Sequence, residues 1–217
     1  MGNRPLPRNE KGLTTGSVCS INIPAFSSLK GEAHSMKLRL LAAAVLMAVC
    51  AIAGISQTQA QKDADRVATR ERLRQLLIDS GPKKGIEIAF RQSDKQPFNF
   101  VAVKKGGFAN AEGFEVVVGV SADQTIGFRI YPYYKGGYIN VNKARDGAAL
   151  MRKMLNLNDH NFLFWGADDT GDVFAGYTFT LENGFPDKSL EIILYSIAPL
   201  DQYIGQMRPL IDGTSAP

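Results

Sequence analysis

The stretch LMRKMLNLNDHNFLFWGADDTGDVFAGYTFTLENGFPDKSLEIILYSIAPLDQYIGQM, Leu150–Met207, decides the fold that we predict for this chain. It opens with the end of a helix, Leu150–Asn156. Two segments follow, Asn161–Ala167 and Asp172–Leu181, in which apolar residues alternate as they do in paired strands. Asp187–Met207 then returns to the apolar spacing of a helix. The stretch therefore predicts a helix, a β-hairpin and a second helix, in that order.

The turn of this hairpin, Asp168-Asp169-Thr170-Gly171-Asp172, contains three aspartates. Asp and Gly at these positions are typical of tight turns. Oxygen atoms of Asp168, Thr170 and Asp172 would also suit calcium, but the distal glutamate of a calcium loop is missing. We interpret the segment as a hairpin turn. In the helix that follows, Pro186 suits the first helical position, and Pro199 removes an amide donor, so we expect a kink there.

The residues before Leu150 predict a helix, several strands and a second helix. The first helix is Lys62–Ser80, which Gly81-Pro82 ends. Strand patterns occupy five segments: Ile86–Phe90, Phe98–Lys104, Phe114–Val120, Thr125–Tyr131 and Tyr138–Val141. The second helix is expected from Lys143, with Asn142 as its N-cap and an apolar stripe of Ala144, Ala148, Met151 and Leu155. The fold class predicted is α+β with an antiparallel sheet.

The first sixty residues have the composition of an export signal. Met36–Arg39 is positively charged, Leu40–Ile55 is apolar, and Ser56–Ala60 is small and polar. The apolar run is shorter than the roughly 20 residues that cross a bilayer, so we expect cleavage after Ala60 and a periplasmic or secreted protein. Contact with a membrane would then require an uncleaved leader that serves as an anchor, which is the alternative interpretation.

Signal peptides begin at the start of a chain, yet Met1–Ser35 precedes this one. That segment is rich in Pro and Gly and lacks periodicity, so we interpret it as a start-site artefact or a disordered tail. The predicted organisation is therefore a start-site artefact or disordered tail over residues 1–35, a signal peptide over 36–60, and a single α+β domain over 61–217.

Cysteine and charge both concentrate in the leader. Cys19 and Cys50 precede residue 61, and Val49 is unsuited to a lipoprotein box at Cys50. The remaining chain then has no disulfide, no thiolate metal site and no cysteine nucleophile. Six of the 25 Lys and Arg residues and two of the 21 Asp and Glu residues also precede residue 61, which leaves 19 of each sign. A balanced domain gives no reason to expect nucleic acid as a partner.

Residues with catalytic or ligand-binding chemistry do not form a constellation. His160 is the single histidine after residue 60 and lacks a second ligand, a nucleophile or a positioning partner in the sequence. Lys104-Lys105-Gly106-Gly107 does not have the spacing of a phosphate-binding loop. We therefore predict no catalytic residue, no cofactor and no metal site, and we expect that the protein is not an enzyme.

Four tyrosines, Tyr131, Tyr133, Tyr134 and Tyr138, surround the turn Lys135-Gly136-Gly137. Tyrosine offers a large contact area at low entropic cost, so these residues are the predicted partner-binding surface. The alternative is that the rings pack on a sheet edge with their hydroxyls in water.

The predicted element order, the run Met154-Leu155-Asn156-Leu157 and the Asp-rich hairpin leading into Leu190–Ile204 resemble the YbjN family. The resemblance covers Arg72–Met207 and implies a fold similar to the class I type III secretion chaperones. It also implies non-enzymatic proteins that are often dimeric or partner-binding and are linked to regulation or stress. This chain departs from the family in its export signal and in one additional strand before the middle helix. The family has no site motif, so no functional residue is carried over.

Two functional hypotheses follow. The first is an exported, non-enzymatic domain that binds a protein or peptide partner, or a second copy of itself, at the unpaired strand edge expected after Tyr133 or in a helix groove. The second is a hydrolase or inhibitor of cell-envelope polymers that uses the carboxylates of Asp168, Asp169 and Glu182.

Overall fold

A computed structural model describes residues 59–215. The segment Met1–Ser35 and the predicted leader Met36–Ala60 lie outside the described residues, except that Gln59 and Ala60 are helical. Within residues 59–215, every helix is too short or too polar to cross a membrane.

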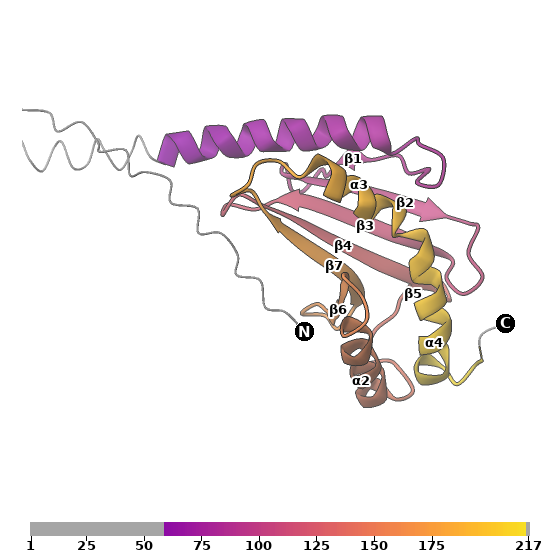
Figure 1. Ribbon diagram of the computed structural model, residues 1–217. Helices are drawn as coiled ribbons and strands as arrows, with labels where there is room; N and C mark the ends of the chain where they lie inside the picture. The colour runs from indigo at the N-terminus through magenta and orange to yellow at the C-terminus, as the bar shows by residue number, and fades with distance from the viewer. Residues whose placement is uncertain (1–58, 216–217) are drawn as a thin grey trace, which may run out of the picture. The chain divides into compact units, whose positions relative to one another are not determined.

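The described chain forms one antiparallel sheet and a set of helices (Figure 1). A helix over residues 59–80 comes first, close to the predicted Lys62–Ser80. The strands are β1 (Arg91–Gln92), β2 (Asn99–Lys105), β3 (Gly113–Val120), β4 (Thr125–Tyr134), β5 (Gly137–Tyr138), β6 (Phe164–Ala167) and β7 (Val173–Thr180). The later helices are α2 (Gly147–Asn158), α3 (Asp187–Tyr195), the short 3₁₀ helix η1 (Ala198–Leu200) and α4 (Asp201–Ile211). The α+β class predicted from the sequence is confirmed.

The strands of the sheet lie in the order β1-β2-β3-β4-β7-β6. The short strand β5 is not part of this order and pairs with β4. β4 and β7, far apart in sequence, are neighbours with Ile126 opposite Phe179 and Ile130 opposite Ala175. Consecutive side chains of a strand point to opposite faces. The apolar residues that alternate along β3 and β4 therefore all lie on one face, where they are fully buried.

The helices cover this face. Leu73 and Leu77 of the first helix, Leu150 of α2, Leu194 of α3 and Ile204 of α4 belong to the same buried cluster as the sheet residues. Figure 1 shows α3 and α4 running across the sheet. We call this the covered face and the opposite one the open face.

The Asp-rich segment is a hairpin turn, as predicted. The Asp168 carboxylate accepts hydrogen bonds from the amide and hydroxyl of Thr170 and from the amide of Asp172. Gly171 has φ +85°, which glycine adopts without strain. The described residues hold no cluster of His, Cys, Asp or Glu that could bind a metal ion.

Helix α2 differs from the prediction in both its start and its face. Asp146, not Asn142, is the N-cap and accepts a hydrogen bond from the Ala149 amide. The cause is tertiary, because the amides of Arg145 and Asp146 donate to the carbonyls of Ile211 and Leu210.

The buried stripe of α2 is Leu150, Met154 and Leu157. The predicted stripe was wrong, since Met151 is exposed and Leu155 is 67% exposed. The helix has two apolar stripes, and its contacts with β6 and α4 select the second one.

Three further predictions were wrong in detail. Pro199 lies within η1, so the expected kinked helix is two helices separated by a turn. Pro186 is the N-cap of α3 and not its first helical residue. The segment Ile86–Phe90 is not a strand, because Glu87 has φ +52° and the Ile88 amide donates to the Gly81 carbonyl in place of a neighbouring strand.

Candidate functional site

The open face carries a continuous row of aromatic rings. Ring centroids are 4.8 Å apart for Tyr133 and Tyr138, 5.5 Å for Tyr138 and Tyr131, 5.7 Å for Tyr131 and Phe174, and 5.8 Å for Phe174 and Phe164. We call these five residues the aromatic row. Phe174 is buried but does not belong to the cluster on the covered face. The row is therefore a second apolar assembly, built on the other side of the sheet.

Glu115 fixes one end of the row. Its Oε2 accepts hydrogen bonds from the hydroxyls of Tyr133 at 2.8 Å and Tyr138 at 2.7 Å. Burial, followed by the hydrogen bonds with Tyr133 and Glu115, raises the pKa of Tyr138 far above its ordinary value. Both phenols thus stay protonated donors at neutral pH, and the rings are held in place before any partner arrives.

Tyr134 does not join this row. Its hydroxyl donates to Asp212 at 2.8 Å, and Asp212 also pairs with Lys135 at 2.5 Å. Alternation along β4 places Tyr131 and Tyr133 on the open face and Tyr134 on the covered face. The structure therefore brings together three of the four predicted tyrosines and separates the fourth.

A groove of about 760 Å³ runs beside the row. Gly119 of β3 and Gly127 of β4 face each other on its floor. The guanidinium of Arg129, an exposed residue, lies 4.9 Å from the centroid of the Phe174 ring, at the boundary between groove and row. The site thus combines apolar rings, a cation and, at Gly127, a part of the groove floor that carries no side chain.

The glycines of the long strands are distributed unequally. Those of β3, β4, β6 and β7 all lie on the open face: Gly113, Gly119, Gly127, Gly166 and Gly176. At four of these glycines an added Cβ atom would lie close to a neighbouring group. The neighbour is the Lys104 carbonyl at Gly113, the Asn99 side chain at Gly119, the Phe174 ring at Gly166 and the Phe164 ring at Gly176. At Gly127 a Cβ would meet nothing within 4 Å. Packing within the described chain therefore does not explain Gly127.

The sequence did not reveal Phe164, Phe174, Arg129 or Gly127 as members of this site. Phe164 and Phe174 belong to the hairpin, which joins the other residues through the pairing of β7 with β4. Glycines within strand patterns were a usable signal, because such glycines often mark the close approach of a ligand or another backbone.

The expected unpaired edge after Tyr133 is absent. β4 pairs with β3 on one side and with β5 and β7 on the other. β6 is an edge of the sheet, but the side chain of Asn158 bonds to both the amide and the carbonyl of Trp165, at 2.6 and 3.2 Å. Asn158 thus occupies the place of an added strand at this edge, whereas the aromatic row lies on a face of the sheet.

The three carboxylates proposed for hydrolysis are not brought together. Asp168 and Asp169 precede β7, whereas Glu182 follows it. Although burial acts to raise the pKa of Asp168, hydrogen bonds from Thr170 and from the Asp172 amide hold it below its ordinary value. A carboxyl group that acts as a general acid needs a raised pKa, because it must still carry its proton near neutral pH.

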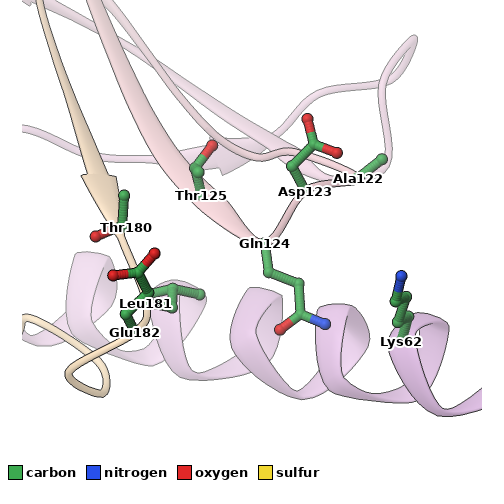
Figure 2. Close-up of a pocket in the computed structure, with 8 residues that line it drawn as sticks. All are labelled: Lys62, Ala122, Asp123, Gln124, Thr125, Thr180, Leu181 and Glu182. Carbon is green, nitrogen blue, oxygen red and sulfur yellow. The ribbon is translucent and has the colours of Figure 1, made fainter.

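Glu182 instead lines a cavity of about 530 Å³ at the other end of the sheet. Figure 2 shows Lys62 and Glu182 at opposite ends of this cavity, with Gln124 between them, so its charged groups do not converge. His160 is exposed beside Asp159, with 3.7 Å between Nε2 and Oδ2. Neither place has the geometry of an acid–base pair.

No family model, curated protein or solved structure matches this chain. The fold defines the chain's class as an α+β protein in which helices cover one face of an antiparallel sheet. The resemblance to the YbjN family stays a prediction.

Proposed function

We propose that this domain is a non-enzymatic binding module that holds a protein or peptide partner on the open face of its sheet. The observation that carries the proposal is the aromatic row beside a groove in which Gly127 leaves open space over the sheet. Aromatic residues are enriched at the cores of protein interfaces, and tyrosine is among the residues that most often carry the binding energy. Rings that are already fixed by Glu115 lose little entropy when a partner binds.

The groove favours an extended peptide segment. Gly127 leaves part of the groove floor without a side chain, so a main chain can lie directly on the sheet there while its side chains contact the aromatic row. Arg129 lies exposed at the boundary and is suited to an acidic residue of the partner. The matching partner is therefore a peptide or protein segment with at least one Asp or Glu.

Peptide selection on the immobilised domain tests this function. We expect a random peptide library to yield acidic binders whose affinity falls at least tenfold for Gly127→Val, which places a side chain on the open part of the groove floor. Gly137→Val is the matched control, because a Cβ there also meets nothing within 4 Å and Gly137 lies outside the groove. Binders that tolerate Gly127→Val would contradict the proposal, and so would a selection without binders.

The partner on the open face could also be a second copy of this chain, and the same variant tests for such a homodimer. Sedimentation of the wild type and of Gly127→Val separates the two cases, since a homodimer formed on the open face would dissociate in the variant.

The proposal also retains export, with the domain periplasmic or secreted after removal of Met36–Ala60. N-terminal sequencing of the native protein tests export, and a chain that keeps this segment would instead be anchored.

A further inference from the structure

A second cavity lies on the helix side of β6, away from the open face. It measures about 260 Å³ and is formed where the segment before β6 meets η1 and α4. Phe162, Leu163, Pro199 and Leu200 supply its apolar walls, and Trp165 lies among them. Trp165 is opposite Ala175 in the sheet, so its ring is on the covered face.

Trp165 has a hydrogen-bond donor that the described residues leave unused. The side chain is 3% exposed, and its Nε1 finds no acceptor within residues 59–215. A buried donor without a partner costs about 1–3 kcal/mol, and native structures rarely contain one without a reason. A bound acceptor would remove this cost.

The other polar groups around the cavity are already engaged. The Tyr203 hydroxyl donates to Asn161 Oδ1 at 2.5 Å, and Asn161 Nδ2 donates to the Leu157 carbonyl at 2.7 Å. The Ser196 hydroxyl donates to the Ile192 carbonyl at 2.7 Å. Within residues 59–215, Trp165 Nε1 is thus the donor atom in this wall that has no hydrogen-bond partner.

The walls also define the charge and the size of the ligand. No Lys, Arg, His, Asp or Glu lines the cavity, so a charged ligand would lose its hydration without a counter-ion. A cavity of 150 Å³ holds benzene, so this one holds about ten non-hydrogen atoms.

We propose that this cavity binds a small neutral molecule that is apolar except for one acceptor oxygen, and that this oxygen accepts a hydrogen bond from Trp165 Nε1. An ester, ketone or lactone has this chemistry. Because Nε1 is buried, the oxygen reaches it after a small rotation of a ring in the wall, and side-chain shifts of this kind are common on binding. The site is independent of the partner-binding face.

A rival explanation exists within the structure. The rings of Trp165 and Tyr203 meet edge to face, with centroids 6.2 Å apart and planes at 72°. If the indole N–H already points at the Tyr203 ring, it has a weak partner and gains little from an acceptor. The experiment must therefore measure the contribution of the acceptor oxygen itself.

Trp165 is the single tryptophan of the chain, so its fluorescence reports directly on the cavity. We expect methyl cyclohexanecarboxylate to cause a saturable change in emission, and the cyclohexanecarboxylate ion to bind at least tenfold more weakly. Ser196→Leu, which narrows the cavity and keeps the fluorophore, should abolish the change, whereas Gly127→Val should leave it intact. No saturable change in the wild type, or a change that persists in Ser196→Leu, would overturn the proposal.

Trp165→Phe isolates the hydrogen bond. By calorimetry, this substitution should weaken the ester about three- to tenfold, the worth of one ordinary hydrogen bond, and leave propylcyclohexane nearly unchanged. Equal losses for both ligands would favour the Tyr203 explanation and overturn the assigned acceptor. Competition between the ester and the selected peptides would overturn the small-molecule assignment, because it would make the cavity part of the partner site.

Discussion

The two faces of β3 and β4 differ although they share one backbone. On the covered face Phe114, Val116 and Val118 are fully buried beneath the helices. On the open face the intervening residues are Glu115, Val117 and Gly119, which are half-buried. The covered face is packed for stability, whereas the open face holds fixed rings, a cation and glycines. Side chains that are held in fixed positions before a partner arrives bind that partner at a lower entropic cost.

The largest effect is expected from the covered face. Phe114→Ala should lower the free energy of unfolding by about 3–5 kcal/mol, because it removes a fully buried ring and leaves a cavity. Val103→Ala on the open face, where Val103 is 43% exposed, should cost less than about 1 kcal/mol. Urea unfolding of both variants measures the difference. Similar losses would show that the open face is also a stabilising core.

The helix layer depends on a carboxylate at its rim. Asp201, the first residue of α4, accepts hydrogen bonds from the amides of Ala109, Asn110 and Ala111 at 2.8–3.0 Å. Asp201→Ala should cost about 2–3 kcal/mol, since it leaves these amides without their charged acceptor. Thermal unfolding measures the loss, and Gln202→Ala at an exposed neighbouring position is the control. An unchanged midpoint would mean that water replaces the carboxylate.

Alternation in the sequence was sufficient to predict most of the sheet and the face of each strand. Ile126, Phe128 and Ile130 alternate along the predicted strand Thr125–Tyr131, and all three are buried on one side of β4. The start of α2 was not predictable, because the amides of Arg145 and Asp146 bond to carbonyls more than sixty residues away. Local patterns contain no information on such contacts.

The part of the candidate site that is local in the sequence could be predicted, and the part that depends on long-range strand pairing could not. Tyr131, Tyr133 and Tyr138 are close in sequence, so their clustering was visible as composition. Phe164 and Phe174 join them through the pairing of β7 with β4, which the sequence does not specify. The same alternation, applied strictly along β4, would have separated Tyr134 from its neighbours.

A smaller, pH-dependent effect is expected at Asp212. Hydrogen bonds from Lys135 and Thr214, opposed by burial and aided by Tyr134, lower the pKa of this carboxyl well below its ordinary range. The ionised Asp212 carboxylate therefore stabilises the fold fully at pH values above the pKa of an unperturbed aspartate, about 3.9. This stabilisation is lost as the pH falls through the lowered pKa of Asp212 in the folded state. Asp212→Asn should be less stable than the wild type at pH 7, and the gap should narrow below about pH 4.

Urea midpoints of the two proteins from pH 7 to pH 2 measure this gap. Lys135→Met should reproduce part of the loss at neutral pH, because it removes the largest cause of the lowered pKa. A gap that is independent of pH would assign the role of Asp212 to hydrogen-bond geometry alone.

The smallest expected change in stability gives the sharpest test of the open face. At Gly127 a Cβ meets nothing within 4 Å and φ is not positive, so the backbone accepts a side chain there without strain. Gly127→Val should raise the free energy of unfolding by up to about 1 kcal/mol, because glycine is unfavourable within strands and valine favourable. At Gly119, opposite it, a Cβ lies 2.2 Å from Asn99 Oδ1, so Gly119→Val should instead be destabilising or displace that side chain. If Gly127→Val is more stable yet loses the selected peptides, glycine at this position serves binding and not folding. A loss of stability there would show that the groove floor is part of the packed structure, and the distinction between the two faces would fail.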